Sequence, residues 1–291
     1  MLGILLIDKP QGLTSHDVVN DIRRRLGLRR VGHAGSLDPM ATGALVVAVG
    51  PATRFLQYLP LEPKEYVAEV TFGAETDTQD ALGEVVREDE VPADLDARIT
   101  ASLPALIGPV QQLPPMYSAI KKQGKPLYAY ARQGQEVERT PRTVYIEAFE
   151  EVGRENNTRT YRVVCSGGTY VRTLAHDLGQ FVGCGAHLSA LRRTRVGRYE
   201  VRDATPLEVI SPEHLIPLRA ALPPMPLVKM DTNRTNLIRE GQSVSGGYSG
   251  REAFVALIEP SGEVFSVARV LGNRLQPECV IPAEALERAA L

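Results

Sequence analysis

The sequence predicts an α+β protein with a mixed, mainly antiparallel central sheet that is flanked by helices, followed by a small β-rich domain. Before residue 223, predicted strands and helices alternate irregularly, and several predicted strands directly follow one another, as in hairpins. This pattern favours α+β over a doubly wound parallel sheet. A proline-rich stretch at 223–226, Pro-Pro-Met-Pro, is the best candidate for a linker. We therefore expect two domains, residues 1–225 and residues 226–291.

The chain begins with a strand and an amphipathic helix. Residues 3–8 are an apolar run that ends at the turn sequence Lys-Pro-Gln-Gly. Thr14 and Asp17 then have the spacing of a capping pair at a helix N-terminus. The helix that follows has its apolar residues on one face, which comprises Val18, Val19, Ile22 and Leu26.

Residues 32–43 contain three glycines and one proline, and we expect them to form a loop. A strand over 44–49 and a short helix over 53–59 follow this loop. Residues 66–72 alternate between apolar and polar types and predict a half-buried strand. The next helix lies on an acidic segment and is marked by Leu95, Ile99, Leu103 and Leu106.

The rest of the first predicted domain contains two more helices and a pair of strands. We expect a short helix over 127–133, sheet strands over 144–152 and 160–165, and a helix over 169–181. Beyond the linker, the sequence predicts a hairpin that turns at Pro-Ser-Gly-Glu. Its two strands comprise residues 253–258 and 264–270.

The composition excludes several classes of protein. Of the 291 residues, 43% are hydrophobic and 23% are charged, which is typical of a globular chain and not of a disordered or fibrous one. No apolar run approaches the ~18 residues of a membrane span, and the N-terminus lacks the basic lead of a signal peptide. The three cysteines form no Cys-x-x-Cys pair. We therefore expect a reduced, cytoplasmic protein with no membrane partner and no structural zinc.

Charge is distributed unevenly along the chain. The formal net charge is −2, but residues 61–108 alone contain 12 acidic and 3 basic side chains. The remainder is mildly basic, and clusters of arginine and lysine in it can follow the phosphates of a nucleic acid. A solvated surface is an equally good interpretation of such clusters. They comprise Arg23, Arg24, Arg25, Arg29 and Arg30, then Lys121, Lys122 and Lys125, then Arg192, Arg193, Arg195 and Arg198.

The sequence has no pattern for a nucleotide, dinucleotide or catalytic metal. It contains neither a Walker loop nor G-x-G-x-x-G after a strand, and it contains no H-E-x-x-H. Its five histidines are scattered without the spacing of metal ligands. We expect no cofactor and no metal ion.

The loop at residues 32–43 is the most unusual segment, and it contains Asp38. Glycines allow positive φ angles or close approach of another backbone, and Pro39 restricts Asp38 to extended conformations. A carboxylate on a stiff loop beside a histidine suits a nucleophile or a general base. An Asx-type turn, in which the carboxylate bonds its own backbone, is the structural alternative.

Several segments together resemble the TruB family of tRNA pseudouridine synthases, which is related to the dyskerin-type enzymes. The loop Gly-His-Ala-Gly-Ser-Leu-Asp-Pro-Met-Ala-Thr-Gly and the preceding segment from Gly3 to Val19 are similar to the family's first motif. The similar segments cover most of residues 2–200 in the family's order. The others are Lys64-Glu65-Tyr66, residues 76–80 (TDTQD), residues 115–121 (PMYSAIK), residues 127–134 (LYAYARQG), residues 166–173 (SGGTYVRT) and residues 187–193 (HLSALRR).

The resemblance implies both a fold and a reaction. The fold would be that of the pseudouridine synthases, with a C-terminal domain similar to the PUA type of RNA-binding domain. The reaction would be isomerisation of uridine 55 in the TΨC loop of tRNA to pseudouridine, by base flipping and attack of an aspartate. It implies the tRNA T-arm as partner, no cofactor, and a monomer with no obligate protein partner.

The resemblance also implies roles for particular residues. Asp38 resembles the catalytic aspartate, which attacks either C1′ of the sugar or C6 of the base; both routes stay open. Tyr66 resembles the aromatic residue that packs on the flipped base, although outside the motif it would be an ordinary strand-edge tyrosine. Arg172 resembles the partner of Asp38, because a nearby cation keeps a desolvated aspartate ionised. Tyr170 resembles a residue that contacts the base, and Leu191 an apolar wall of the pocket.

Two further residues near the first motif are candidates for the site. A stacked base must be extruded before it can react, and the resemblance implies that His33 fills the vacated stack. A role for His33 as general base for Asp38 is less favoured, because the isomerisation needs no deprotonated water. Lys9 could brace the site or contact a phosphate.

Two other functions were weighed against this one. An RNA-binding or RNA-folding protein with an inactive site is disfavoured by the presence of Asp38, Tyr66 and Arg172 together. A nucleoside or glycosidic hydrolase breaks the same bond, but retaining hydrolysis normally uses two carboxylates, and only Asp38 lies in the loop motif. Release of free uracil would identify a hydrolase.

Overall fold

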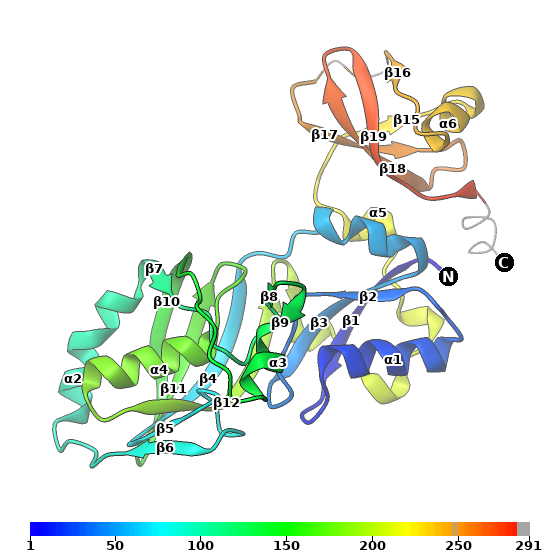
Figure 1. Ribbon diagram of the computed structural model, residues 1–291. Coiled ribbons are helices and arrows are strands. Elements are labelled where there is room, and N and C mark those ends of the chain that lie inside the picture. Colours follow the sequence, from blue (N-terminus) through cyan, green and yellow to red (C-terminus); the bar gives the residue numbers. More distant parts are fainter. Residues whose placement is uncertain (247, 249, 284–291) are drawn as a thin grey trace. The chain divides into compact units, whose positions relative to one another are not determined.

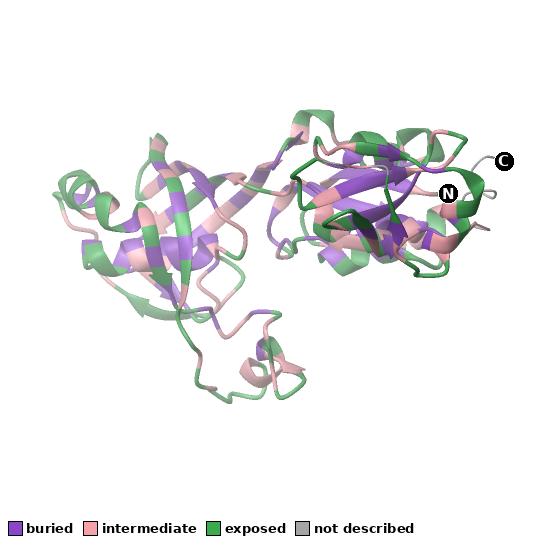
Figure 2. Ribbon diagram, turned by 90° about the horizontal axis from the view of Figure 1, so that it is seen from above, coloured by how far each residue is buried: buried purple, intermediate pink, exposed green. Residues whose placement is uncertain are grey.

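The computed structural model describes residues 1–246, 248 and 250–283, and its contacts divide the chain into two compact units (Figure 1). The first unit comprises Met1–Asp38, Leu45–Pro60 and Asp203–Leu291, and the second comprises Pro39–Ala44 and Leu61–Arg202. The chain therefore passes from one unit to the other directly after Asp38. In each unit, buried residues follow the strands of the sheets (Figure 2).

The N-terminal part of the first unit is a small sheet covered by one helix. Its strands have the order β14-β1-β3, and β2 pairs with β3. The pair of β1 with β14 is parallel, and the pair of β2 with β3 is antiparallel. The elements are β1 (Gly3–Lys9), α1 (Ser15–Leu26), β2 (Val31–Ala34), β3 (Thr42–Val49, which is shared with the second unit), η1 (Gly50–Tyr58), η3 (Val201–Asp203, of which only Asp203 is in this unit), β14 (Thr205–Pro206), η4 (Leu207–Val209), η5 (Pro212–His214) and α5 (Leu218–Ala221).

Helix α1 confirms the predicted caps and the predicted apolar face. Thr14 and Asp17 form a reciprocal capping box, and the helix ends at Gly27, whose φ of 65° is in the left-handed region. Val18 and Ile22 are buried in the core against β1 and β3. The arginines of its last turn lie outside this core, since Arg23 is half-buried and Arg24 and Arg25 are exposed.

The prediction that all of residues 32–43 form a loop is wrong in part. Residues 31–34 are strand β2, in which His33 lies opposite Val47 of β3. Thr42 and Gly43 are the first residues of strand β3, so only Gly35 to Ala41 form the expected loop. The strand was concealed because it has only four residues, one of them a glycine, and such a short run shows no clear alternation of apolar and polar residues.

The C-terminal part of the first unit is a separate sheet with its own core, and it confirms the predicted β-rich character and the hairpin. The strand order is β15-β17-β18-β19-β16, and β17 and β18 are the predicted hairpin. The core contains Phe265, Val255 and Leu257. The elements are β15 (Leu227–Lys229), α6 (Thr232–Arg239), β16 (Val244–Ser245), β17 (Phe254–Ile258), β18 (Val264–Leu271) and β19 (Arg274–Val280).

The second unit is built on a larger sheet with the strand order β12-β4-β11-β10-β7. These neighbours are all antiparallel, and the first residues of β3 add a parallel pair to β12. The predicted mixed, mainly antiparallel sheet flanked by helices is confirmed. The elements are β4 (Lys64–Phe72), β5 (Ala74–Thr76), β6 (Val85–Glu88), α2 (Leu95–Ser102), η2 (Leu103–Leu106), β7 (Gly108–Gln112), β8 (Lys121–Lys122), β9 (Lys125–Pro126), α3 (Leu127–Ala131), β10 (Arg142–Glu155), β11 (Thr158–Cys165), α4 (Val171–Val182), β12 (Ala186–Val196) and β13 (Tyr199–Glu200).

Strand β12 is the main element that the sequence did not predict. It pairs with β4 along nearly its whole length, but the register shifts twice, between Leu188 and Ala190 and between Arg193 and Arg195. Each bulge adds one residue to one strand. The apolar positions therefore lose the strict alternation that identifies a strand in a sequence.

The described residues contain no helix that is long and apolar enough to cross a membrane. The three cysteines are free and buried. Burial raises the pKa of the Cys165 thiol, and that of Cys279, to about 11.

Candidate active site

The loop that carries Asp38 is held in place by the N-terminus of α1. Ser15, the first residue of α1, is 3% exposed. The backbone N–H of Leu37 donates to Oγ of Ser15 at 2.8 Å, and Oγ donates to the carbonyl oxygen of Leu37 at 3.2 Å. Asp38 follows at once and is half-buried, with Pro39 on its other side. The carboxylate thus lies on a segment whose backbone is bonded to a helix, which limits its freedom.

Lys9 and His33 lie in the same unit as Asp38. Lys9 is 0% exposed, and its Nζ donates to the carbonyl oxygens of Pro10 at 2.8 Å and Leu13 at 2.6 Å. These two bonds join Lys9 to the turn between β1 and α1. His33 is half-buried on β2, five residues before Asp38.

Tyr66 and Leu191 come together on one face of the sheet in the second unit. In the pair β4–β12, Tyr66 lies opposite Arg193 and Leu191 lies opposite Ala68. Directly opposed residues point to the same face of a sheet, so Tyr66 and Leu191 are diagonal neighbours. Both are buried. Since β4 lies between β12 and β11, Tyr66 is on an interior strand and not on a strand edge.

Close packing of β3 against β12 requires a glycine beside this face. A Cβ atom at Gly43, where φ is +102°, would lie 2.2 Å from the carbonyl oxygen of Arg193. Arg193 itself is 1% exposed, and its Nε donates to the carbonyl oxygen of Ala44 at 2.7 Å. Arg193 therefore does not belong to a phosphate-binding surface, and for this residue that interpretation of the charge cluster is wrong.

Arg172 is buried at the start of α4 and joins three segments of the second unit. Arg172 is 4% exposed. One terminal nitrogen donates to the carbonyl oxygen of Thr78 at 3.0 Å and contacts the Asp80 carboxylate at 3.4 Å. The other donates to the carbonyl oxygen of Tyr117 at 2.9 Å.

The sequence around Arg172 does not indicate which acidic residue pairs with it. Asp80 is 92 residues away in the chain, and it is buried with Arg172. Its other carboxylate oxygen accepts from Oγ1 of Thr78 and from the backbone N–H of Leu82. These bonds hold the carboxylate so that it can orient the guanidinium.

Tyr170 precedes Arg172 by two residues and forms the N-cap of α4. The ring lies under the guanidinium of Arg142, whose central carbon is 4.7 Å from the ring centroid. The side-chain amide of Gln112 bonds both backbone polar groups of Tyr170. Asp80 and Ser15 lie in the family-like segments of the sequence but had no role assigned to them there, and Gln112 and Arg142 lie outside those segments.

Charged groups flank Tyr66 on β4, in the segment Lys64-Glu65-Tyr66. Burial, together with nearby Arg193, lowers the pKa of Lys64 below its ordinary value. Burial alone would raise the pKa of Glu65, but the bond from Thr194 and the contact with Arg162 lower it. Glu65 therefore stays ionised and links β4 to both of its neighbouring strands.

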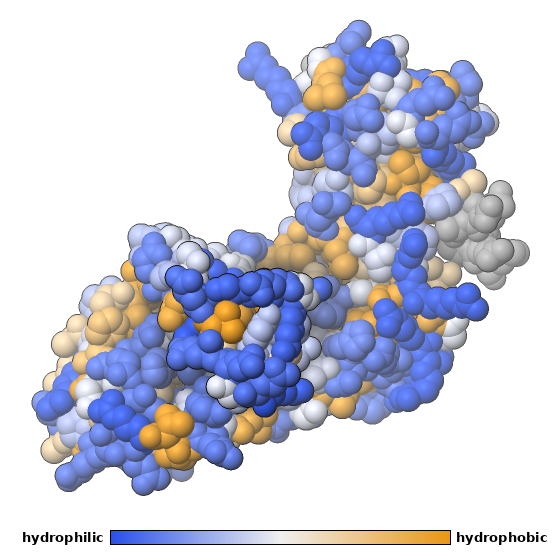
Figure 3. Space-filling view, in the orientation of Figure 1, coloured by the Kyte–Doolittle hydropathy of each residue, from blue (hydrophilic) through white to orange (hydrophobic). Residues whose placement is uncertain are grey.

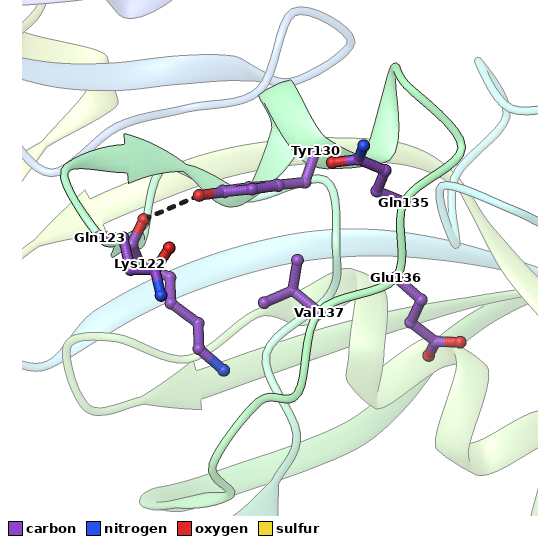
Figure 4. Close-up of a pocket in the computed structure, with 6 residues that line it drawn as sticks. All are labelled: Lys122, Gln123, Tyr130, Gln135, Glu136 and Val137. Atoms are coloured by element: carbon purple, nitrogen blue, oxygen red, sulfur yellow. Dashed lines mark hydrogen bonds between the residues drawn. The ribbon is translucent and has the colours of Figure 1, made fainter.

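A basic and aromatic segment projects from the second unit at β8, β9 and α3. It surrounds a pocket of about 430 Å³ in which the Tyr130 hydroxyl donates to the carbonyl oxygen of Lys122 (Figure 4). The Nζ atom of Lys125 lies 4.4 Å from the Tyr130 ring centroid, and Arg132 lies over Tyr128. Mostly hydrophilic residues, around a small hydrophobic spot, cover this segment in Figure 3. The pocket is lined by Lys122, Gln123, Tyr130, Gln135, Glu136 and Val137, none of which is a predicted site residue.

Comparison with known proteins identifies the family. Residues 23–171 match the model of the N-terminal domain of the TruB family of pseudouridylate synthases. Residues 172–225 match the model of a tRNA pseudouridylate synthase B C-terminal domain. The chain belongs to the TruB family. The resemblance expected from the sequence is thereby confirmed, and the protein is a pseudouridylate synthase.

Individual members of the TruB family are similar over most of the chain. The tRNA pseudouridine synthase B of Syntrophotalea carbinolica is 51% identical over 230 residues, which are 76% of this chain and 75% of that one. The tRNA pseudouridine synthase B of Cupriavidus metallidurans is 42% identical over 295 residues, covering 96% and 94% of the two chains.

Solved structures of the related dyskerin type have the same fold. A chain of a Cbf5-Nop10-Gar1 complex is 27% identical, with a TM-score of 0.65, and the match covers 97% of this chain and 86% of that one. A chain of an H/ACA RNP bound to a substrate RNA containing 2′-deoxyuridine is 25% identical, with the same TM-score of 0.65 and coverage of 96% and 85%. These matches confirm the expected pseudouridine synthase fold.

Proposed function

We propose that this TruB-family protein isomerises uridine to pseudouridine in tRNA, at position 55 of the TΨC loop. The observation that carries the proposal is the continuous match of residues 23–225 to the two models of this family. Relatives that are 51% and 42% identical bear the name tRNA pseudouridine synthase B, which supports tRNA as the substrate. The assignment of the target to position 55 is inferred from the resemblance of the Asp38 loop to the first motif of the family.

In the proposed reaction, Asp38 is the nucleophile. Its ionised carboxylate adds either to C1′ of the ribose or to C6 of the uracil. The bond between N1 and C1′ breaks, the uracil turns, and C5 bonds to C1′. The bond between the Asp38 carboxylate and C1′ or C6 then breaks, which releases the free carboxylate. The proton that leaves C5 is balanced by the proton that N1 gains, so the step is an isomerisation without an oxidant, reductant or co-substrate. Bonding of the neighbouring Leu37 to Ser15 supports this role, because a nucleophile must be held in a fixed position.

Four residues of the second unit are proposed to contact or align the base. Tyr66 packs on the flipped uracil, and Leu191, its diagonal neighbour on the sheet, provides an apolar wall. Tyr170 contacts the base from the start of α4. Arg172 keeps Asp38 ionised in the dry pocket, and Asp80 orients Arg172. In the first unit, Lys9 braces the turn before α1.

RNA binding is assigned to two parts of the chain. The segment of β8, β9 and α3 combines lysines with tyrosines, a combination that suits the phosphates and bases of a folded RNA. We infer that residues 226–291 form a PUA-like RNA-binding domain and residues 1–225 the catalytic domain. The end of the family match at residue 225 and the separate core beyond it support this boundary. We propose that the protein acts on the T-arm as a monomer, in the cytoplasm.

The decisive test is incubation with unmodified tRNA, followed by mapping of pseudouridine at nucleotide resolution. We expect one modified position, uridine 55, without any added metal or cofactor. Free uracil in place of pseudouridine would identify a hydrolase. Binding without modification would identify an RNA-binding protein with an inactive site, and either result would contradict the proposal.

His33 is expected to assist extrusion of the base and to take no part in the chemical step. Replacement by alanine should slow the reaction on folded tRNA by about tenfold, because unstacking a base costs a few kcal/mol. The loss should be smaller on a short, flexible T-loop RNA whose target base is already loosely stacked. Single-turnover rates of His33→Ala on both substrates test this, and equal losses would indicate a direct chemical or structural role.

A further inference from the structure

Gln112 and Arg142 are paired across two strands and project toward the same residue. Strands β7 and β10 are antiparallel neighbours (Figure 1). Gln112 is the last residue of β7, Arg142 is the first of β10, and the two lie directly opposite each other. Opposed residues point to the same face of a sheet. On that face is Tyr170, at the N-terminus of α4.

The side chain of Gln112 bonds the backbone of Tyr170 at two points. The Tyr170 N–H donates to Oε1 of Gln112 at 2.7 Å, and Nε2 of Gln112 donates to the Tyr170 carbonyl oxygen at 3.0 Å. Gln112 is 0% exposed. A buried amide with both of its polar atoms bonded to one residue holds the backbone of that residue in one position.

Arg142 holds the side chain of Tyr170. Its guanidinium lies over the ring, with 4.7 Å between the central carbon and the ring centroid. The same group packs against Gly168, where an added Cβ atom would lie 3.5 Å from the central carbon and where φ is +84°. The Nε atom of Arg142 is buried without a hydrogen-bond partner among the described residues. The main contact of this cation is therefore the aromatic face and not a carboxylate.

We propose that Gln112 and Arg142, here called the Tyr170 clamp, are positioning residues that set where Tyr170 meets the uracil. Gln112 fixes the backbone, and Arg142 fixes the plane of the ring. The proposal rests on the proposed function in one respect, which is that Tyr170 contacts the base. Neither clamp residue needs to touch the RNA, so both should act on the rate of the chemical step and not on RNA affinity.

The first test compares Gln112→Ala with Gln111→Ala. Gln111 is the adjacent residue of β7, is exposed, and bonds Oγ1 of Thr143 on the opposite face, so it is a matched control. With enzyme in excess over tRNA, we expect Gln112→Ala to lower the single-turnover rate of pseudouridine formation by about tenfold or more, since a misplacement of 1 Å can cost about 100-fold. The Kd for tRNA should change by less than about threefold. Gln111→Ala should match wild type in both.

The second test shows whether the clamp acts through Tyr170. In a Tyr170→Ala background, Gln112→Ala and Arg142→Met should cause no further loss of rate, because the ring that they position is absent. Arg142→Lys should retain more activity than Arg142→Met, since it keeps a cation over the ring. If Gln112 and Arg142 had only a structural role, their replacement would lower the rate of pseudouridine formation equally in the wild-type and the Tyr170→Ala backgrounds.

The outcomes separate this proposal from the proposed function. If wild type forms no pseudouridine, the proposed function fails. If wild type is active, the clamp is overturned by a Gln112→Ala rate equal to that of Gln111→Ala, by full activity of Tyr170→Ala, or by losses that persist in the Tyr170→Ala background. If circular dichroism shows that Gln112→Ala does not fold, the variants of the half-buried Arg142 replace it in the test. The clamp is then overturned if Arg142→Met forms pseudouridine as fast as Arg142→Lys and wild type.

Discussion

Asp38→Asn should form no measurable pseudouridine, with a rate at least about 1,000-fold below wild type, because removal of a nucleophile abolishes covalent catalysis. The amide of asparagine has nearly the shape of the carboxylate, but it is a poor nucleophile toward carbon. The loop should keep its conformation, because its bonds to Ser15 are made by the backbone of Leu37. Binding of tRNA should therefore persist.

The measurement is single-turnover formation of pseudouridine, together with the Kd for tRNA from filter binding. Asp17→Asn is a matched control in the same unit, because Asp17 acts in the capping box of α1 and has no proposed role in the reaction. It should lower the thermal stability slightly and leave the rate unchanged. An Asp38→Asn rate within about tenfold of wild type, which corresponds to only about 1.4 kcal/mol, would refute Asp38 as the nucleophile.

The second largest effect is expected at Arg172. Arg172→Met removes the donor for two backbone carbonyl oxygens and leaves the buried carboxylate of Asp80 without its cation. Removing one partner of a buried ion pair typically lowers the free energy of unfolding by about 3–5 kcal/mol. We expect a clear drop in the melting temperature and, at a temperature where the variant is fully folded, a rate about 100-fold or more below wild type.

Arg172→Lys separates the charge of this residue from its geometry. Lysine keeps the cation, but a single ammonium on a flexible stem cannot replace a planar fork that reaches three acceptors. Its rate should lie between those of Arg172→Met and wild type. Arg154→Met is the control, because Arg154 is itself exposed and pairs with Asp96 and with the half-buried Glu151, and ion pairs of an exposed side chain contribute little. A folded Arg172→Met protein that reacts as fast as wild type would exclude a role for Arg172 in alignment.

Local interactions were predictable from the sequence because their signals are local. The capping box of α1 joins residues three positions apart, and its buried face repeats with the helical period. Strand β4 alternates as predicted, since one of its faces packs in the core and the other is exposed. The loop around Asp38 was conspicuous for the same reason, because its glycines and proline restrict the backbone within a few residues. The ordered motifs identified the family in the same way.

The sequence by itself thus determined the class of fold, the main helices and strands of regular period, the candidate nucleophile and the family. The tertiary structure alone decided which distant residues bond the candidate residues and fix their positions. Asp80 reaches Arg172 across 92 residues, and Gln112 reaches Tyr170 across 58. A buried polar group needs one partner with the right geometry, wherever in the chain that partner lies. Such a pair leaves no periodic pattern, and the two bulges of β12 removed the pattern that would have shown the strand beside Tyr66.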